Sequence, residues 1–163
     1  MKETAKSSLG QLPALHKYLL EQRSFFSVFD FGAGKYGKTD QAYAETNLAY
    51  YPYDPYNRDA ASNEHNVQCL KWGHCSILAC ANVLNVVPDE DLQLVINKLY
   101  DFTTWTKQKT CYVSVYYNRD LEQDRSTSYG GYQRNKPLAW YIPKLEGFFD
   151  SVKKEKNFLV CKP

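Results

Sequence analysis

The sequence lacks several features that would assign the protein to common classes. No apolar run reaches the roughly 18 residues that a membrane-spanning helix needs, and residues 1–10 lack the apolar core of a signal peptide. There is also no strong excess of one charge, because 20 basic residues face 18 acidic ones and the net charge is +2. This balance neither demands nor excludes a nucleic-acid partner. These absences predict a cytoplasmic protein without a membrane anchor.

The cysteines show no framework for disulfides or zinc. Their number is five, which is odd, and no Cys-x-x-Cys occurs. The group His65, Cys69, His74 and Cys75 matches no standard zinc spacing. We therefore expect reduced thiols and no metal site. At 163 residues, without repeats or low-complexity segments, the chain has the length of a single domain.

The most informative segment is a short apolar strand followed by glycines. Asp30 stands near the end of the run 27–31, and Gly32 and Gly34 come directly after it. Glycines allow backbone to approach a ligand closely and to adopt positive φ. Open α/β sheets bind ligands at the carboxyl ends of their strands. The segment therefore predicts the floor of a nucleoside-cofactor site.

A second acid, Asp54, closes another apolar run at about the distance expected of an acid that binds ribose hydroxyls. Residues 30–34 (Asp-Phe-Gly-Ala-Gly) resemble the first motif of class I S-adenosylmethionine-dependent methyltransferases. Residues 53–55 (Tyr-Asp-Pro) resemble the second motif, and residues 81–87 resemble the motif at the end of the fourth strand. Over residues 25–116 the chain is thus similar to this family, and especially to its small bacterial and phage methyltransferase-like members.

The resemblance implies how the cofactor S-adenosylmethionine would be held. The turn after the first strand would cradle the methionine part, with Asp30 near its amino group, and Asp54 would accept hydrogen bonds from both ribose hydroxyls. Changing Asp54 to alanine is then expected to weaken cofactor binding by about 1–3 kcal/mol and to leave folding intact. The cofactor-binding residues predicted in this way are Asp30, Gly32, Ala33, Gly34, Lys35, Asp54, Pro55 and Asn82.

The acceptor side departs from the family pattern. The signature of nucleic-acid amino-methylases, Asn or Asp followed by two prolines and an aromatic residue, is absent after Asn82. After the expected third strand only Gln68 can accept a hydrogen bond from adenine, where many members of the family have an acid. The acceptor stays open among nucleotides, nucleic acids and small metabolites. The catalytic candidates are Asn85 and Tyr132, and the substrate-binding candidates are Asn85, Arg119, Gln133, Arg134 and Asn135.

Alternation of strand and helix patterns predicts a Rossmann-like, doubly wound α/β fold. The resemblance adds a mostly parallel sheet with a C-terminal antiparallel hairpin, in a minimal class I methyltransferase fold. We predict one domain, with a helical cap (1–24), a cofactor-binding core (25–116) and a region of substrate loop, helix and terminal strands (117–163). Strands are predicted at 28–31, 49–53, 67–70, 76–81 and 110–116 and within 151–161, and helices near 12–22, at 39–46, from 88 and from 137.

Two other functions fit parts of the sequence. Residues 32–37 also satisfy Gly-x-Gly-x-x-Gly, the fingerprint of NAD-binding folds, so an NAD-linked oxidoreductase is one alternative. The absence of a diagnostic catalytic base leaves a second one, a catalytically silent binding module that keeps the fold and acts through a protein partner.

Overall fold

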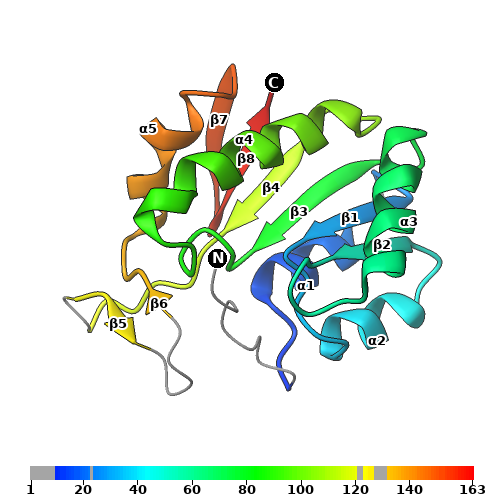
Figure 1. Ribbon diagram of the computed structural model, residues 1–163, viewed down its shortest axis with the longest axis horizontal. Coiled ribbons are helices and arrows are strands. Elements are labelled where there is room, and N and C mark those ends of the chain that lie inside the picture. Colours follow the sequence, from blue (N-terminus) through cyan, green and yellow to red (C-terminus); the bar gives the residue numbers. More distant parts are fainter. Residues whose placement is uncertain (1–9, 23, 121–122, 127–131) are drawn as a thin grey trace.

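The computed structural model describes residues 10–22, 24–120, 123–126 and 132–163, which form an α/β fold around one six-stranded sheet. Figure 1 shows the strands fanned out in the order β2-β1-β3-β4-β8-β7. The first four of these run parallel to one another, whereas β8 runs antiparallel to both β4 and β7. The predicted mostly parallel sheet with a C-terminal antiparallel hairpin is therefore confirmed. The strands are β1 (Ser27–Phe31), β2 (Ala49–Tyr53), β3 (Ile77–Ala81), β4 (Cys111–Ser114), β7 (Ser151–Glu155) and β8 (Phe158–Lys162).

Helices cover both faces of the sheet, as the doubly wound prediction requires. Successive residues of a strand point to opposite faces, so Val28 packs in one hydrophobic cluster and Phe29 in the other. The Val28 cluster includes residues of α1 (Ala14–Glu21) and α2 (Lys38–Ala44). The Phe29 cluster includes residues of the remaining helices, which are α3 (Ala60–Lys71), α4 (Asp89–Trp105), the short 3-10 helix η1 (Leu138–Tyr141) and α5 (Ile142–Leu145).

The strand predicted at 67–70 is wrong, because these residues form the last turns of α3. Asp59 caps this helix, since its Oδ1 accepts the Ser62 N–H at 2.8 Å. The segment is too short for its apolar residues to distinguish a strand from a buried helical turn. Consequently Gln68, the predicted adenine acceptor, lies on a helix instead of at the end of a strand, and it does not line the large cavity described below.

One smaller boundary also differs from the predictions. The strand predicted at 110–116 ends at Ser114, so residues 115–118 leave the sheet as irregular backbone. The helix predicted from residue 137, which the sequence expects Pro143 to interrupt, is divided into η1 and α5. Pro143 lies in the first turn of α5, where a missing N–H is tolerated. A two-stranded ribbon, β5 (Arg125–Ser126) with β6 (Tyr132–Gln133), stands apart from the main sheet.

The cysteines are buried free thiols, and burial raises the pKa of Cys75 and Cys161 to about 12, so both stay protonated at neutral pH. In the described part of the chain no group of three His, Cys, Asp or Glu side chains can hold a metal ion. No helix among the described residues is long and apolar enough to cross a membrane.

Candidate functional site

A cavity of about 1330 Å³ opens where β1, β2, β3 and β4 end. Strand β1 has β2 on one side and β3 on the other. The connection from β1 to β2 therefore runs toward one edge of the sheet, and the connection from β2 to β3 returns past β1 toward the other edge. Ligands of open α/β sheets bind at such a switch point. Because β8 is antiparallel to β4, the turn that precedes Phe158 lies at the same edge. Helix α1 closes the cavity on the side of the Val28 cluster, and residues 11–18 contribute to its wall.

The glycine loop after β1 forms one wall of the cavity. Gly32 has φ +77°, a conformation that side chains rarely adopt. A Cβ atom at this position would lie 2.4 Å from Cγ2 of Val83, which belongs to the loop after β3. The N–H groups of Gly32 and Ala33 both donate to the Tyr53 carbonyl, at 2.7 and 3.1 Å. Glycine at position 32 therefore lets the two loops touch at the bottom of the cavity.

Asp54 lines the cavity but is also bonded heavily to its own chain. Its side chain is buried, and Oδ2 accepts the Gly34 N–H at 2.9 Å. Oδ1 accepts the N–H groups of Tyr56 and Asn57 at 2.9 and 3.0 Å, as well as the Asn57 side-chain amide at 3.1 Å. A carboxylate offers about four lone-pair positions, so the remaining acceptor capacity is mainly at Oδ2. Asp54 can therefore accept a ligand hydroxyl while it holds the glycine loop in place.

Asp30 lies deeper, in a buried polar network under α1. The Tyr50 hydroxyl donates to Asp30 Oδ2 at 2.5 Å, and His16 Nε2 lies 3.3 Å from the same oxygen. His16 Nδ1 is in turn 3.2 Å from the Tyr43 hydroxyl. Burial, together with the Asp30 carboxylate, raises the pKa of both tyrosines far above the ordinary value. Both phenols therefore stay protonated, and Tyr50 acts as a hydrogen-bond donor that stabilises the Asp30 carboxylate.

A charged clamp holds the glycine loop from the opposite side. Arg58 donates to both oxygens of Asp40, at 2.7 and 2.9 Å, in a bidentate pair, and its Nε donates to the Gly34 carbonyl at 2.7 Å. Asp40 also accepts the Gly37 N–H at 3.0 Å, at the start of α2. Both charges of the pair are largely shielded from solvent. The loop is thus fixed by side chains from α2 and from the segment after β2.

The loop after β3 supplies the polar groups of the opposite wall. Asn82 has φ 60°, and its N–H donates to the Ser114 carbonyl at 2.8 Å. Asn85 is 1% exposed and lines the cavity, and its buried Oδ1 has no hydrogen-bond partner. A buried acceptor without a partner costs about 1–3 kcal/mol. A ligand that donates a hydrogen bond to Asn85 would recover this energy.

Arg134 ties a distant segment to the loop after β3. Its guanidinium is buried and donates to the carbonyls of Leu84 at 2.8 Å and Val87 at 3.0 Å, and it pairs with the exposed carboxylate of Asp89. The Arg134 N–H donates to the Asn85 carbonyl at 2.6 Å. This arginine therefore positions the residues around Asn85 and does not itself line the cavity.

Changing Arg134 to methionine is expected to lower the free energy of unfolding by about 1.5–3 kcal/mol, because two buried carbonyls lose a charged donor while the apolar stem is kept. Urea unfolding measures this loss. Changing the exposed Arg119 to methionine is the matched control, with an expected change within about 0.5 kcal/mol. Equal stability of the two variants would contradict the structural role of Arg134.

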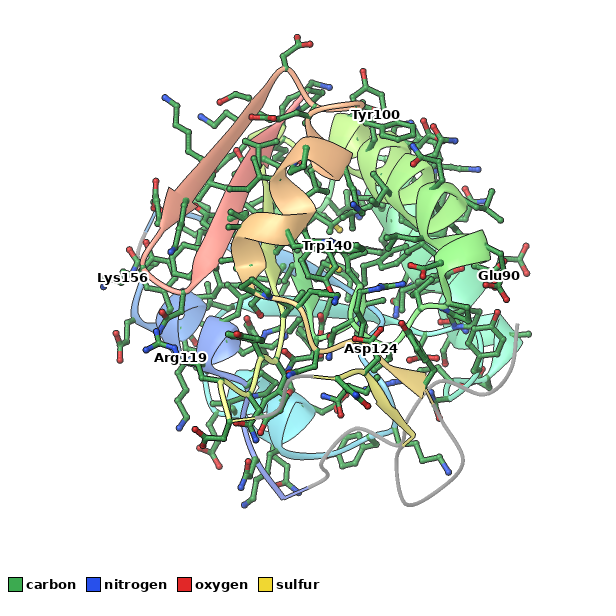
Figure 2. All side chains as sticks on the ribbon, turned by 90° about the vertical axis from the view of Figure 1, so that its left-hand side faces the viewer. Glu90, Tyr100, Arg119, Asp124, Trp140 and Lys156 are labelled. Atoms are coloured by element: carbon green, nitrogen blue, oxygen red, sulfur yellow. The ribbon has the colours of Figure 1, made fainter. Side chains whose placement is uncertain are left out.

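Tyr132 and Asn135 lie beside Arg134 and also stay outside the cavity wall. The Tyr132 hydroxyl donates to Asp124 at 2.8 Å, and burial, with this bond, raises the pKa of Tyr132 to about 12. Asn135 exchanges two hydrogen bonds with the backbone of Asn118. Figure 2 shows Asp124 at the ribbon of β5 and β6, below Trp140. These contacts connect the residues after β4 with the segment that carries Arg134.

The structure brings most of the predicted site residues to one cavity. Those that line it are Asp30, Gly32, Ala33, Gly34, Lys35, Asp54, Asn82, Asn85, Arg119 and Gln133. Those that do not line it are Pro55, Tyr132, Arg134 and Asn135. Ligand binding by the residues that line the cavity remains a prediction. The cofactor-binding, substrate-binding and catalytic roles of the four residues outside it also remain predictions.

Sequence reasoning missed three residues that shape the site. For His16 the sequence leaves two roles, a solvated helix face, which it favours, and a reach into the cofactor site. His16 follows Leu15 on the buried stripe, is 1% exposed and lines the cavity, so helical periodicity alone could have placed it. Asn63 holds the backbone of Asp54 by accepting its N–H at 2.9 Å and donating to its carbonyl at 2.8 Å. Arg58 gives no local signal, because its partners come from the glycine loop and from α2.

No protein-family model matches the chain, and no curated protein matches it either. The function is therefore argued from the geometry of the site.

Proposed function

We propose that the protein binds S-adenosylmethionine in this cavity and transfers its methyl group to an acceptor. The observation that supports this most strongly is the meeting of the glycine loop, Asp30 and Asp54 in one cavity at the switch point of the sheet. These are the residues that the sequence motifs single out, and they arrive there from two different strands. The bound cofactor would supply an electrophilic methyl group on a sulfonium.

The hydrogen bonds of the glycine loop favour a ligand without phosphates. Asp30 and Asp54 line the cavity together with Lys17, Lys35 and Lys38, so the choice of ligand rests on these hydrogen bonds and not on the net charge of the lining. A pyrophosphate needs free N–H groups at the glycine turn and the helix N-terminus. Here the N–H groups of Gly32, Ala33 and Gly34 donate to β2 or to Asp54, and that of Gly37 donates to Asp40. S-adenosylmethionine carries no phosphate and bears positive charge at its sulfonium and ammonium.

The topology supports the same choice. Dinucleotide-binding sheets of the Rossmann type use the order 3-2-1-4-5-6 with parallel strands. In this protein β8 and β7 form an antiparallel hairpin at the edge beyond β4. That hairpin is a feature of the fold implied by the methyltransferase resemblance, so the NAD-linked alternative is the weaker one.

The chain's own residues have distinct tasks in this proposal. Asp54 Oδ2 accepts a ribose hydroxyl, while its bond to Gly34 keeps the loop in the shape of the ligand. Asp30, held by Tyr50 and His16, provides the negative charge for the cofactor's amino group. Asn85 orients the acceptor through its side-chain carbonyl. Alignment of the acceptor with the methyl group supplies most of the rate, since methyl transfer is an in-line displacement.

Isothermal titration calorimetry with S-adenosylmethionine, S-adenosylhomocysteine and NADH tests the proposal. We expect micromolar dissociation constants for the two sulfur nucleosides, worth about 8 kcal/mol, and no binding of NADH. Binding of NADH alone would replace the proposal with the oxidoreductase alternative. Failure of all three ligands to bind a folded protein would leave the silent interaction module.

A further inference from the structure

Three cations line the end of the cavity beside β4. We call this part, lined by Arg119, Lys154 and Lys156, the basic end. The cofactor end has charges of both signs, because Lys35 and Lys38 line it together with the carboxylates. Among the described charged residues, those that follow β4 and those at the turn between β7 and β8 add only cations to the lining.

The sheet explains why these three cations gather. Val113 of β4 pairs with Leu159 of the antiparallel strand β8, so the residues that leave β4 and the turn that enters β8 reach the same edge. Arg119 follows β4, and Lys154 and Lys156 flank the turn. Figure 2 shows Arg119 and Lys156 on the same side of the molecule, next to α1. Lys156 is held in place over the ring of Tyr18, 5.1 Å from its centroid.

Within the described part of the chain, no carboxylate forms an ion pair with a cation of the basic end, whose members are Arg119, Lys154 and Lys156. Three unpaired cations around a concave surface focus a positive potential that attracts an anion, and a phosphate suits them best.

Aromatic and polar groups lie next to these cations. Tyr116 and Tyr117, two residues that follow β4, line the cavity and are 47% and 39% exposed. Exposed aromatic rings are the surfaces on which planar bases stack. Asn85 lines the same cavity and has an unsatisfied, buried Oδ1. The segment 134–135 joins these parts, because the Arg134 N–H donates to the Asn85 carbonyl and the Asn135 side chain exchanges two hydrogen bonds with the backbone of Asn118.

We propose that the methyl acceptor is a nucleotide unit whose phosphate binds Arg119, Lys154 and Lys156, while its base lies against the tyrosines that follow β4 and donates an N–H to Asn85 Oδ1. This inference names the acceptor for the proposed function, and only its methyl-transfer step rests on that proposed function. Binding of the phosphate and the base depends only on the basic end and on Asn85. A free nucleotide and a nucleotide within a single strand share this chemistry.

Fluorescence anisotropy tests the proposal on the full chain, in the presence and absence of saturating S-adenosylhomocysteine. The probe is a labelled single-stranded DNA oligonucleotide of mixed sequence, with the four nucleoside 5′-monophosphates and the matching nucleosides as competitors. The variant Arg119→Gln/Lys154→Gln/Lys156→Gln is expected to bind at least about tenfold more weakly. Removal of three phosphate contacts should also reduce the slope of log K against log salt by about 2.

Two further variants separate the parts of the site. Lys153→Gln removes the same charge from the neighbouring position of β7, which does not line the cavity, and should change affinity by less than about twofold. Asn85→Leu should weaken binding of the nucleotides several-fold and leave the salt slope unchanged, because it removes a base contact and no cation. Circular dichroism of each variant checks that it is folded.

The outcomes are distinct. Preference for the strand over monophosphates assigns a polynucleotide acceptor, and equal affinity assigns a free nucleotide. Two results would overturn the inference. One is an equal affinity of the triple variant and Lys153→Gln for the oligonucleotide, and the other is the absence of any nucleotide binding in the presence of S-adenosylhomocysteine. The protein could also bind nucleotides through the basic end and fail to bind S-adenosylhomocysteine. That result would support the phosphate subsite and refute the proposed cofactor.

Discussion

Replacing Asp54 by alanine is expected to lower the free energy of unfolding by about 2–4 kcal/mol, in addition to weakening cofactor binding. The expectation from the sequence was a loss of binding with intact folding. The structure changes it, because the buried carboxylate accepts four hydrogen bonds from Gly34, Tyr56 and Asn57. Without it, three backbone N–H groups lose their acceptor, and the glycine loop loses its link to the end of β2.

The variant Asp54→Asn separates the structural role from the ligand role. An amide that keeps its oxygen at the Oδ1 position preserves the bonds to Tyr56 and Asn57 and loses only the one to Gly34, so its loss of stability should be about 1–2 kcal/mol. The remaining acceptor site at Oδ2 is lost entirely, so S-adenosylhomocysteine should bind as weakly as to Asp54→Ala. Urea unfolding and calorimetry measure the two effects.

The matched control is Asp101→Ala, which removes an exposed carboxylate from α4 and should change stability by less than about 0.5 kcal/mol. If Asp54→Ala were as stable as this control, the hydrogen bonds to the carboxylate would not contribute to folding. If Asp54→Asn bound the ligand as tightly as the parent, Asp54 would not contact the ribose.

Replacing Gly32 by alanine is expected to cost about 2–5 kcal/mol of stability and to abolish cofactor binding. Two independent penalties add at this position. The left-handed backbone, with φ +77°, costs a residue with a side chain about 1–2 kcal/mol, and the new methyl group would lie 2.4 Å from Val83 Cγ2, an overpacking worth about 1–3 kcal/mol.

A second substitution divides the two penalties. Val83→Ala removes both γ-carbons that crowd the new Cβ, so Gly32→Ala/Val83→Ala should recover the steric part and keep only the backbone part. A double-mutant cycle from urea unfolding measures this coupling, for which we expect about 1–3 kcal/mol. A coupling near zero would mean that the loops after β1 and β3 do not meet at Gly32. Gly10, where an added Cβ meets no atom within 4 Å, offers the control Gly10→Ala.

The features that could be predicted from the sequence are those encoded in short segments. Asp30 is the fourth residue of the five-residue strand β1, Gly32 follows this strand directly, and Asp54 follows directly on β2, so strand ends and their acids are local patterns. Alternation of strands and helices is also visible along the chain, and it determined the doubly wound α/β class. The strand predicted at 67–70 was wrong because a run of four residues is too short to show whether its apolar residues have the period of a strand or of a helix.

The tertiary structure decided how the site is held together. His16 meets Asp30, Arg58 meets Asp40 and Gly34, and Arg134 meets Leu84 and Val87 only because the sheet brings distant segments to one edge. The inward bonds of Asp54 and the gathering of Arg119, Lys154 and Lys156 have the same origin. Residue types and local periodicity encode which groups a strand end carries. Which partners those groups meet depends on the order and direction of the strands, and this sheet's antiparallel pairing of β8 with β4 made one end of the cavity basic.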